Sequence, residues 1–203
     1  MPRIVYRILA VLGLLAVAGL VLGVVTVRQS GLSARDEPSA VEARLARLVR
    51  GVAIPDVVRR RVNPVPSTPA TMAEARAHFA DHCASCHGND GGGRTALGRR
   101  LYPRAPDMRL PATQSLSDGE LFHVIENGIR FTGMPGWGGE VAPEVSWKLV
   151  LFIRHLPRLG PEDILEMERL NPRSPEEWRE FQQDQEFLQS IPAGTAKDSH
   201  HYH

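Results

Sequence analysis

The residues with the clearest capacity for chemistry lie in the segment DHCASCHGNDGGG, residues 81–93. This segment contains both cysteines of the chain, Cys83 and Cys86, and His87 directly follows the second one. Three interpretations compete for this C-x-x-C-H pattern: a disulfide or redox pair, half of a zinc site, or a site of covalent haem attachment. A structural zinc site usually takes four Cys or His ligands, and the chain has no second cysteine pair. A thioredoxin-like redox pair belongs to a βαβ pattern, and none surrounds residue 83.

The order C-x-x-C-H therefore favours attachment of a c-type haem. The two thiols would add to the vinyl groups of the porphyrin as thioethers, and the imidazole of His87 would bind the iron. One turn of helix presents both thiols and the imidazole to the same face of the ring. The sequence thus predicts one covalent haem c held by Cys83, Cys86 and His87.

A second iron ligand is predicted in NGIRFTGMPGWGG, residues 127–139, where Met134 lies between Gly133 and Pro135. Glycine lets the backbone approach a ring closely, and proline stiffens the turn. A thioether opposite a histidine raises the potential of the iron and suits electron transfer. The alternative is that Met134 fills the core, as methionines commonly do. The weaker candidates for ligation are Met108, His78, His82, His123 and His155.

Several segments in order resemble a class I c-type cytochrome domain over residues 71–157. They are a helix with Phe79 four residues before Cys83, CASCH, a glycine-rich loop, YPRAPDM, LSDGELFHVIENGI, GMPGW and PEVSWKLVLFIRHL. The resemblance covers less than half of the chain. It implies a small all-helical fold around one haem, with His87 and Met134 as axial ligands.

The same resemblance implies two packing details. The first and last helices of the domain cross, which would bring Phe79 to Leu149 and Phe152. A proline carbonyl after the attachment site accepts a hydrogen bond from the ligand imidazole, and Pro103 and Pro106 are both candidates for it.

Local patterns independently predict the helices of this all-α fold. Thr71 with Glu74 forms a potential capping box, and Ser117 with Glu120 repeats the signature before a helix that Gly128 ends. Apolar positions recur at helical spacing from residue 145 to residue 156, and Pro157 closes that segment. No stretch alternates with period two for long enough to predict a strand.

The N-terminus predicts a membrane anchor. Residues 8–27 carry no charge, and twenty such residues are long enough to span a bilayer. Arg3 and Arg7 precede them, which favours a cytoplasmic N-terminus and places the rest of the chain on the periplasmic side of a bacterial inner membrane. A cleaved signal peptide is the alternative, but its apolar core is usually shorter. We therefore assign residues 1–28 to an uncleaved signal-anchor.

Two segments flank the predicted haem domain. Residues 29–70 form a basic, proline-rich tether with a short amphipathic helix. This basic segment is either surrounded by solvent or bound to anionic lipid headgroups. Residues 158–203 form an acidic tail with two predicted helices. A cluster of arginines after the motif would steer an acidic redox partner, bind the haem propionates or bind the tail. It comprises Arg94, Arg99, Arg100, Arg104 and Arg109.

The chain ends in a histidine-rich tract with His200, His201 and His203. Such histidine-rich tracts can bind copper or zinc. The alternatives to a metal site are a disordered polar terminus and an expression tag.

These features together predict a membrane-anchored monohaem electron carrier of a bacterial respiratory chain, which is not itself an enzyme. The alternatives are a haem c subunit of a membrane oxidoreductase or oxidase complex, and a haem-based gas sensor. The expected partners are redox proteins of the inner membrane or periplasm and membrane lipid, but no nucleic acid.

Overall fold

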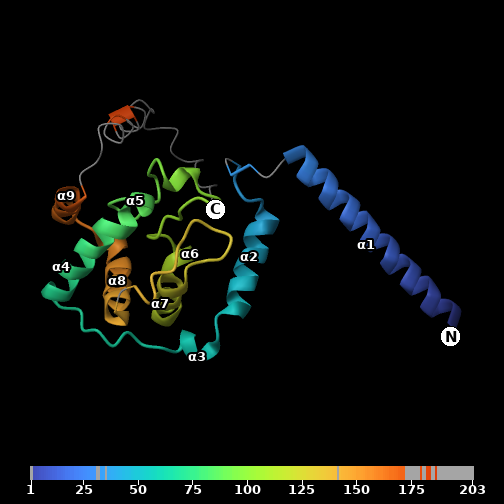
Figure 1. Cartoon of the computed structure of the whole chain (residues 1–203), viewed down its shortest axis with the longest axis horizontal. Helices are drawn as coiled ribbons and strands as arrows, with labels where there is room; N and C mark the ends of the chain where they lie inside the picture. The colour runs from blue at the N-terminus through green and yellow to red at the C-terminus, as the bar shows by residue number, and fades with distance from the viewer. Residues whose placement is uncertain are drawn as a thin grey trace, which may run out of the picture. The chain divides into compact units, whose positions relative to one another are not determined.

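The computed structural model describes residues 2–30, 33–34, 36–140 and 142–171, together with the isolated positions 179, 182, 183 and 186. The chain divides into two units, Met1–Asp36 and Glu37–His203. The described residues form helices and loops and contain no strand, which confirms the predicted all-α class (Figure 1).

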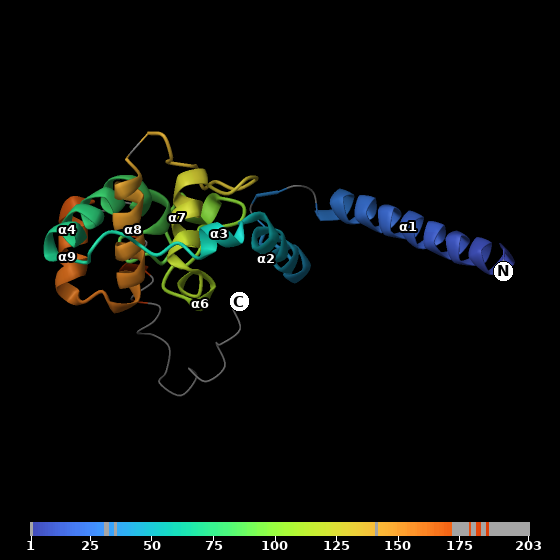
Figure 2. The ribbon, with the colours of Figure 1, turned by 90° about the horizontal axis from the view of Figure 1, so that it is seen from below.

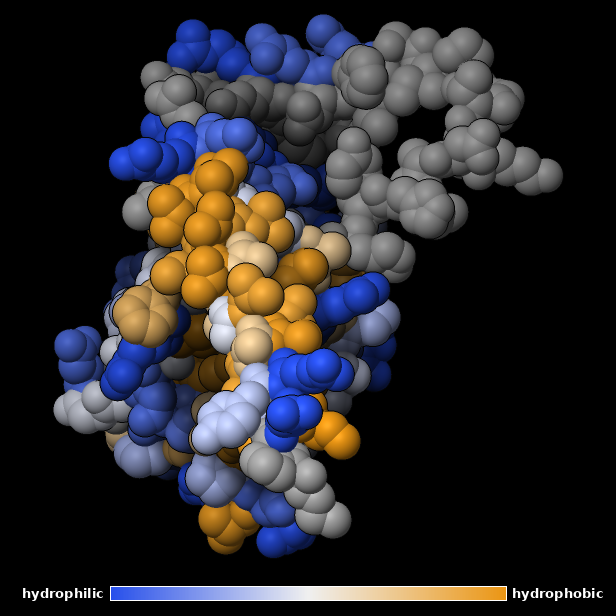
Figure 3. Space-filling model, turned by 90° about the vertical axis from the view of Figure 1, so that its right-hand side faces the viewer, coloured by the Kyte–Doolittle hydropathy of each residue, from blue (hydrophilic) through white to orange (hydrophobic). Residues whose placement is uncertain are grey.

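The first unit is a single long helix, α1 (Pro2–Ser30). Its 29 residues span about 43 Å at the usual helical rise, which exceeds the thickness of about 30 Å of a bilayer core. The window Arg3–Gln29 is apolar enough to cross a membrane, and none of it is buried within the protein. Its side chains form the continuous hydrophobic surface drawn in orange in Figure 3. A signal sequence has the same properties, so the uncleaved anchor stays a prediction.

The second unit contains the remaining helices, and several of them are only one turn long. In chain order they are α2 (Ala40–Ala53), α3 (Asp56–Arg59), α4 (Pro69–His78), the π-helical turn η1 (Phe79–Cys83), α5 (Ala84–His87), the 3₁₀ turn η2 (Gly98–Arg100), α6 (Pro111–Gln114), α7 (Asp118–Asn127), α8 (Pro143–His155), the 3₁₀ turn η3 (Leu156–Arg158) and α9 (Pro161–Leu170). Helix α8 lies between α4 and α7 (Figures 1 and 2).

Helix capping explains where two of these elements begin. The predicted box at α7 is confirmed, because the Glu120 amide donates to the Ser117 hydroxyl and the Glu120 carboxylate accepts from the Ser117 amide. The predicted cap at Thr71 is wrong. Helix α4 begins three residues earlier, with Thr68 as its cap and Pro69 in the first turn. Proline is favoured there because its missing N–H has no helical partner to lose.

The core forms where α4 and α8 cross, as the resemblance implies. Phe79 and Phe152 are fully buried, and their ring centroids lie 5.0 Å apart. Leu149 belongs to the same core cluster. On the other side of α8, Trp147 stacks on Phe122 of α7 with ring centroids 4.2 Å apart. The two aromatic pairs hold α8 between its neighbours.

The segment before α4 packs on this core, although we placed it in the tether. The Asn63 side chain donates to the Trp147 carbonyl at 2.9 Å, and the Arg61 guanidinium lies 4.5 Å from the centroid of the Phe122 ring. A Cβ atom at Gly119 would overlap the carbonyl oxygen of Val58, so this backbone approach requires glycine. The domain boundary at residue 71 stays a prediction, but these contacts extend to its N-terminal side.

Helix α9 is the first of the two helices predicted in the acidic tail, and it packs on the domain. Met167 is fully buried, and Arg76 pairs with Asp163 at 2.6 Å. The side chains of Asn89 and Asn171 hydrogen bond at 2.9 Å. The second predicted tail helix lies outside the continuously described residues.

Candidate functional site

The two cysteines lie where the π-helical turn η1 passes into α5. Both thiols are free and half-buried. Burial, with a repulsive contribution from Cys86, raises the pKa of Cys83 to about 12. Without a bound group, Cys83 is therefore a protonated thiol near neutral pH. The structure does not support a zinc site here, because no group of three His, Cys, Asp or Glu side chains among the described residues is arranged to hold a metal ion.

His87 ends α5, and its environment keeps the ring neutral. Burial lowers the pKa of His87, and the Pro106 carbonyl partly opposes that shift. The Nδ1 atom of His87 is buried and makes no hydrogen bond of standard geometry. The Pro106 carbonyl therefore interacts with the ring through a looser contact than a full hydrogen bond. Of the two proline carbonyls that we considered, the structure favours Pro106. A neutral imidazole is the form that binds a metal.

The loop after the motif folds back against the attachment helix. The Gly93 amide donates to the His87 carbonyl at 2.8 Å. Gly93 has a φ of 71°, in the region that favours glycine, and a Cβ atom there would overlap the carbonyl oxygen of Ala105. These contacts hold the Pro106 region beside His87.

Thr95 and Gly98 join the same loop to the second cysteine. The Thr95 hydroxyl donates to the carbonyls of Ser85 and Cys86 at 2.8 and 3.1 Å, and it accepts from the Gly98 amide at 2.8 Å. A Cβ atom at Gly98 would overlap the Cys86 carbonyl oxygen. The turn η2 is thus packed directly against the attachment motif.

An ion network fixes the far end of the loop. Arg109 donates to Asp90 at 2.7 Å and to Asp107 at 2.6 Å. Burial alone would raise the pKa of Asp107, but the hydrogen bonds and charge of Arg109 hold it below its usual range. Within the predicted arginine cluster, Arg94 also pairs with Asp90, and Arg104 pairs with Glu37. Acidic groups of the same unit therefore neutralise three of the five arginines.

Met134 lies in a loop that is anchored to the end of α7. The Ile129 amide donates to the Met134 carbonyl at 3.1 Å, and the Trp137 amide donates to the Ile125 carbonyl at 3.0 Å. A Cβ atom at Gly128 would lie 2.6 Å from the Met134 carbonyl oxygen. The loop is therefore closely folded on its own backbone around Met134.

Two contacts bring the Met134 loop to the attachment motif. The Trp137 ring meets the ring of His82, next to Cys83, with centroids 5.1 Å apart. A Cβ atom at Gly133 would lie 2.6 Å from the Leu101 side chain, directly after η2. The structure therefore places the loop that carries Met134 against residues next to the attachment motif and to η2, with contacts on both sides of Met134.

The other candidate ligands have different roles. Met108 and Met167 are buried in the core, and Met72 packs against it, so Met134 is the only described methionine of this unit outside the core cluster. The remaining candidates are engaged elsewhere: His155 lies 3.5 Å from Asp163, His123 is within hydrogen-bonding distance of Asn127, and His78 stacks on His82. A covalent haem fits the two free thiols, the neutral imidazole with an unbonded Nδ1, and the methionine left outside the core.

The predicted metal site at His200, His201 and His203 lies outside the described residues. Among the residues that the structure does describe, no group of three His, Cys, Asp or Glu side chains is arranged to hold a metal ion.

Sequence reasoning missed the residues that join the two halves of the site. Thr95, Leu101 and Trp137 supply contacts between the motif, the loop and the Met134 segment. Trp137 stands in the same glycine-rich stretch as Met134, which is the one signal that pointed to it. Thr95 and Leu101 carry no comparable signal.

Comparison with known proteins identifies one family. Residues 70–153 match the family model described as cytochrome C oxidase, cbb3-type, subunit III. The match begins in α4, includes the C-x-x-C-H motif and the Met134 loop, and ends in α8. No curated protein matches the chain.

Proposed function

We propose, from the premise that residues 70–153 form a c-type cytochrome domain, that the chain is a membrane-anchored monohaem electron carrier of a bacterial respiratory chain. A domain of this type indicates electron transfer by haem. The observation that carries the proposal is the position of Met134, which lies outside the core in a loop that contacts the attachment segment through Trp137 and Leu101.

Four side chains would hold the cofactor. The thiols of Cys83 and Cys86 would form the covalent links, and the neutral imidazole of His87 and the thioether of Met134 would be the axial ligands. Bound haem supplies an iron that alternates between the ferrous and ferric states. The Pro106 carbonyl interacts with the imidazole of His87 and would help to orient it, as outer partners of metal-binding histidines do.

The same arrangement favours electron transfer over catalysis. If His87 and Met134 both held the iron, no coordination position would be left for a substrate. The hydrogen bonds and close glycine contacts of the two loops hold their backbones in place. A site that keeps the same ligands in both oxidation states needs little rearrangement for each electron transferred.

The second candidate is a haem c subunit of a membrane oxidoreductase. The family description favours it, because the matched family is named for subunit III of a cbb3-type oxidase. In both cases Arg3 and Arg7 favour a haem domain on the periplasmic side of the membrane.

The test is purification of the full chain from native membranes in mild detergent. We expect one haem per chain, which stays on the polypeptide after denaturing electrophoresis. The double variant Cys83→Ala/Cys86→Ala should lose that haem, whereas Met108→Leu, a volume-conserving core change, should retain it. Haem that persists on the double variant would contradict the proposal.

The same preparation separates the two candidates. A carrier should elute without a stoichiometric catalytic chain and should be reduced and reoxidised by added redox proteins. Stable co-purification with a catalytic oxidase or reductase chain would favour the subunit instead.

A further inference from the structure

Helix α2 carries a hydrophobic surface that no described residue covers. No residue of this helix is buried. Its apolar side chains are between 58% and 88% exposed, and they are Val41, Leu45, Leu48, Val49 and Val52. Exposed large apolar side chains gathered on one helix face mark an interaction surface more often than chance.

The polar side of α2, and not the apolar side, faces the haem domain. Ala43 and Arg50 are half-buried, and Ile54, just after the helix, is buried. At 100° per residue these positions form one stripe, and the apolar residues centre on the opposite side of the helix. The apolar face therefore points away from the domain.

Polar contacts hold α2 in this orientation. The Tyr102 hydroxyl donates to Glu42 at 3.0 Å, and the Arg59 side chain donates to the Gly51 carbonyl. Just before the helix, Arg104 pairs with Glu37 at 2.9 Å. A helix that packed its apolar face on the domain would lose these contacts.

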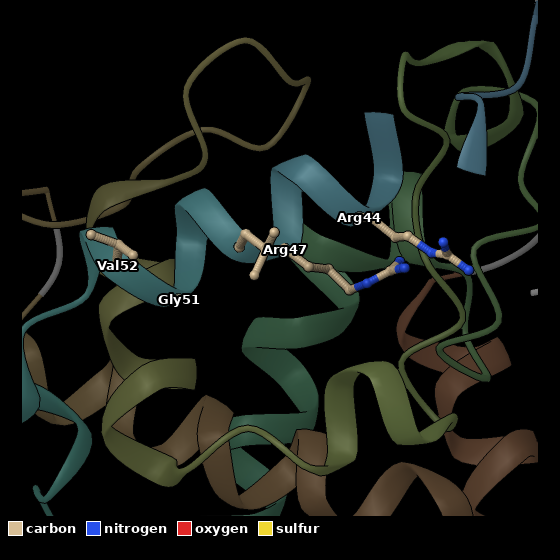
Figure 4. Close-up of a pocket in the computed structure, with 5 residues that line it drawn as sticks. Arg44, Arg47, Gly51 and Val52 are labelled. Carbon is tan, nitrogen blue, oxygen red and sulfur yellow. The ribbon is translucent and has the colours of Figure 1, made fainter. Parts of the chain in front are cut away.

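The outward face is bordered by arginines. A shallow hollow of about 540 Å³ is lined by Arg44, Arg47, Leu48, Gly51 and Val52. Figure 4 shows Arg44 and Arg47 extending in the same direction along one flank, with Val52 at the other end of the helix. An apolar face beside long cationic side chains suits the boundary between lipid headgroups and acyl chains.

We propose that α2 lies in the surface of the same bilayer that holds α1, with its apolar face in the headgroup region and Arg44 and Arg47 at the lipid phosphates. This inference rests on the membrane insertion of α1 in the proposed function. Residues 31–39 connect Ser30 to Ala40, so the chain carries the start of α2 no farther than about 35 Å from the end of α1. That limit keeps the start of α2 near the membrane, and the arginines beside its apolar face suit lipid phosphates, which makes lipid the occupant that we commit to.

The test is a depth measurement on the full haem-loaded chain in lipid nanodiscs that contain anionic lipid. Both native thiols are expected to be consumed by haem, so an introduced cysteine would be the single site for a spin label. Leu45→Cys and Val52→Cys report on the apolar face. Ala46→Cys, also exposed but on a flank of the helix, is the matched control.

For the labels at Leu45 and Val52 we expect several-fold more collisions with molecular oxygen than with a water-soluble nickel chelate. The Ala46 label should show the reverse order. Equal access of the nickel chelate to all three labels would overturn the inference. Protection of Leu45 and Val52 from both reagents would also overturn it, because it would mean that a protein, such as a second copy of the chain, covers the face.

If α1 does not insert into the membrane, the experiment gives a different result from failure of the α2 inference. A chain that does not co-elute with nanodiscs would contradict the membrane insertion of α1, and with it this inference. A chain that co-elutes but shows a water-exposed α2 would overturn the inference alone.

Discussion

The side chains of the haem site carry little charge of their own. Burial keeps the Cys83 thiol protonated, with a pKa of about 12, and keeps His87 neutral by lowering its pKa. The nearest charged network, around Arg109, is internally paired. The predicted haem-binding side chains are therefore uncharged, and the identity of the two ligands would have the main influence on the iron potential.

Met134→Ala should remove the thioether-to-iron band from the ferric visible spectrum while haem stays on the chain. The reduction potential should fall by on the order of 0.1 V, since a thioether ligand favours the ferrous state. Spectroscopy and redox titration check both effects. Met108→Leu is the control and should leave the band in place. A band that survives Met134→Ala would exclude Met134 as the ligand.

Phe131, three residues before Met134, has a φ of 63° and is 92% exposed. A non-glycine residue in this left-handed conformation destabilises the folded state by about 1–2 kcal/mol. Glycine avoids that strain, but its greater freedom in the unfolded chain lowers the folding stability by about 0.5–1 kcal/mol. Phe131→Gly should therefore raise the free energy of unfolding by about 0.5–1 kcal/mol, measured by urea titration of the oxidised protein. Glu140→Gly, at an exposed position without positive φ, should lower it. Greater destabilisation by Phe131→Gly than by the control would contradict this account.

His78 predicts a pH dependence of stability. Burial, with repulsion from His82, lowers its pKa below the ordinary value of 6.5, and Asp81 partly opposes the shift. The unfolded chain thus binds this proton more readily, so the stabilisation is present above about pH 6.5 and is lost as the pH falls through the folded pKa. His78→Gln should therefore lose less unfolding free energy than the wild type between about pH 7.5 and pH 5. His123→Gln is the matched control. Identical pH profiles for wild type and His78→Gln would contradict the prediction.

The candidate site residues follow from spacing alone, because C-x-x-C-H and G-M-P-G are local patterns, and their roles as haem ligands stay a prediction. The choice of Pro106 over Pro103 was not, since both prolines lie in one irregular loop and only folding shows which carbonyl meets His87. The role of Trp137 depends on its contact with His82, which lies 55 residues earlier in the chain.

Loops as well as helices position the candidate site of this protein. Turn η2 packs against the attachment motif through Gly98, and the Met134 loop packs against the residue that follows η2. Each approach uses a position where a side chain would overlap neighbouring atoms. The spacing between His87 and Met134, the two predicted iron ligands, therefore depends on the glycines at these close approaches.

Gly98→Ala tests this dependence. The added methyl group would meet the backbone carbonyls of Cys86 and Gly93, which cannot rotate away, so the loop must shift. We expect a loss of about 1–3 kcal/mol in unfolding free energy, as for other overpacked sites, and a weakened thioether band. Gly51→Ala in α2 is the control, because its Cβ atom meets nothing within 4 Å. It should stabilise its helix by up to about 1 kcal/mol. An unaltered spectrum in Gly98→Ala would show that η2 does not position the site.

The positions of helices were predictable where capping residues or the spacing of apolar residues define them. The box of Ser117 and Glu120 placed the start of α7 correctly, and the apolar spacing predicted α8. The start of α4 was misplaced because Pro69 defines an earlier first turn than Thr71 does. The π-helical turn η1 has no signature in a 3.6-residue pattern. The packing of α9 and of Asn63 depends on contacts more than 80 residues apart in the chain, which no local pattern encodes.

For the whole molecule, the separation into two units makes α1 an independent element. Every fully described side chain of α1 is exposed, so no described part of the haem domain requires it for its core. An apolar helix with that much exposed surface is stable in a membrane but not in water. The helix is therefore expected either to span a membrane or to be cleaved off as a signal sequence.

Membrane extraction and intact mass determination distinguish these outcomes. We expect the haem protein to stay in the membrane pellet at alkaline pH and to retain residues 1–30 in its mass. A variant that lacks residues 2–30 but carries a cleavable export signal should appear in the soluble fraction with its haem attached. A shortened mass and a soluble wild-type protein would identify α1 as a signal sequence.

If α1 is a membrane anchor, the contacts that hold residues 37–63 on the domain limit how far the haem domain can travel from the membrane. If residues 28–68 were a free chain, their extended length would be about 140 Å, whereas residues 31–39 alone reach only about 35 Å. Because the effective concentration of a tethered group falls roughly as the −3/2 power of the tether length, shortening the free tether from residues 28–68 to residues 31–39 would raise that of the haem domain near a membrane roughly tenfold. Such confinement favours fast, repeated encounters with a redox partner embedded in the same bilayer over capture of a freely diffusing one.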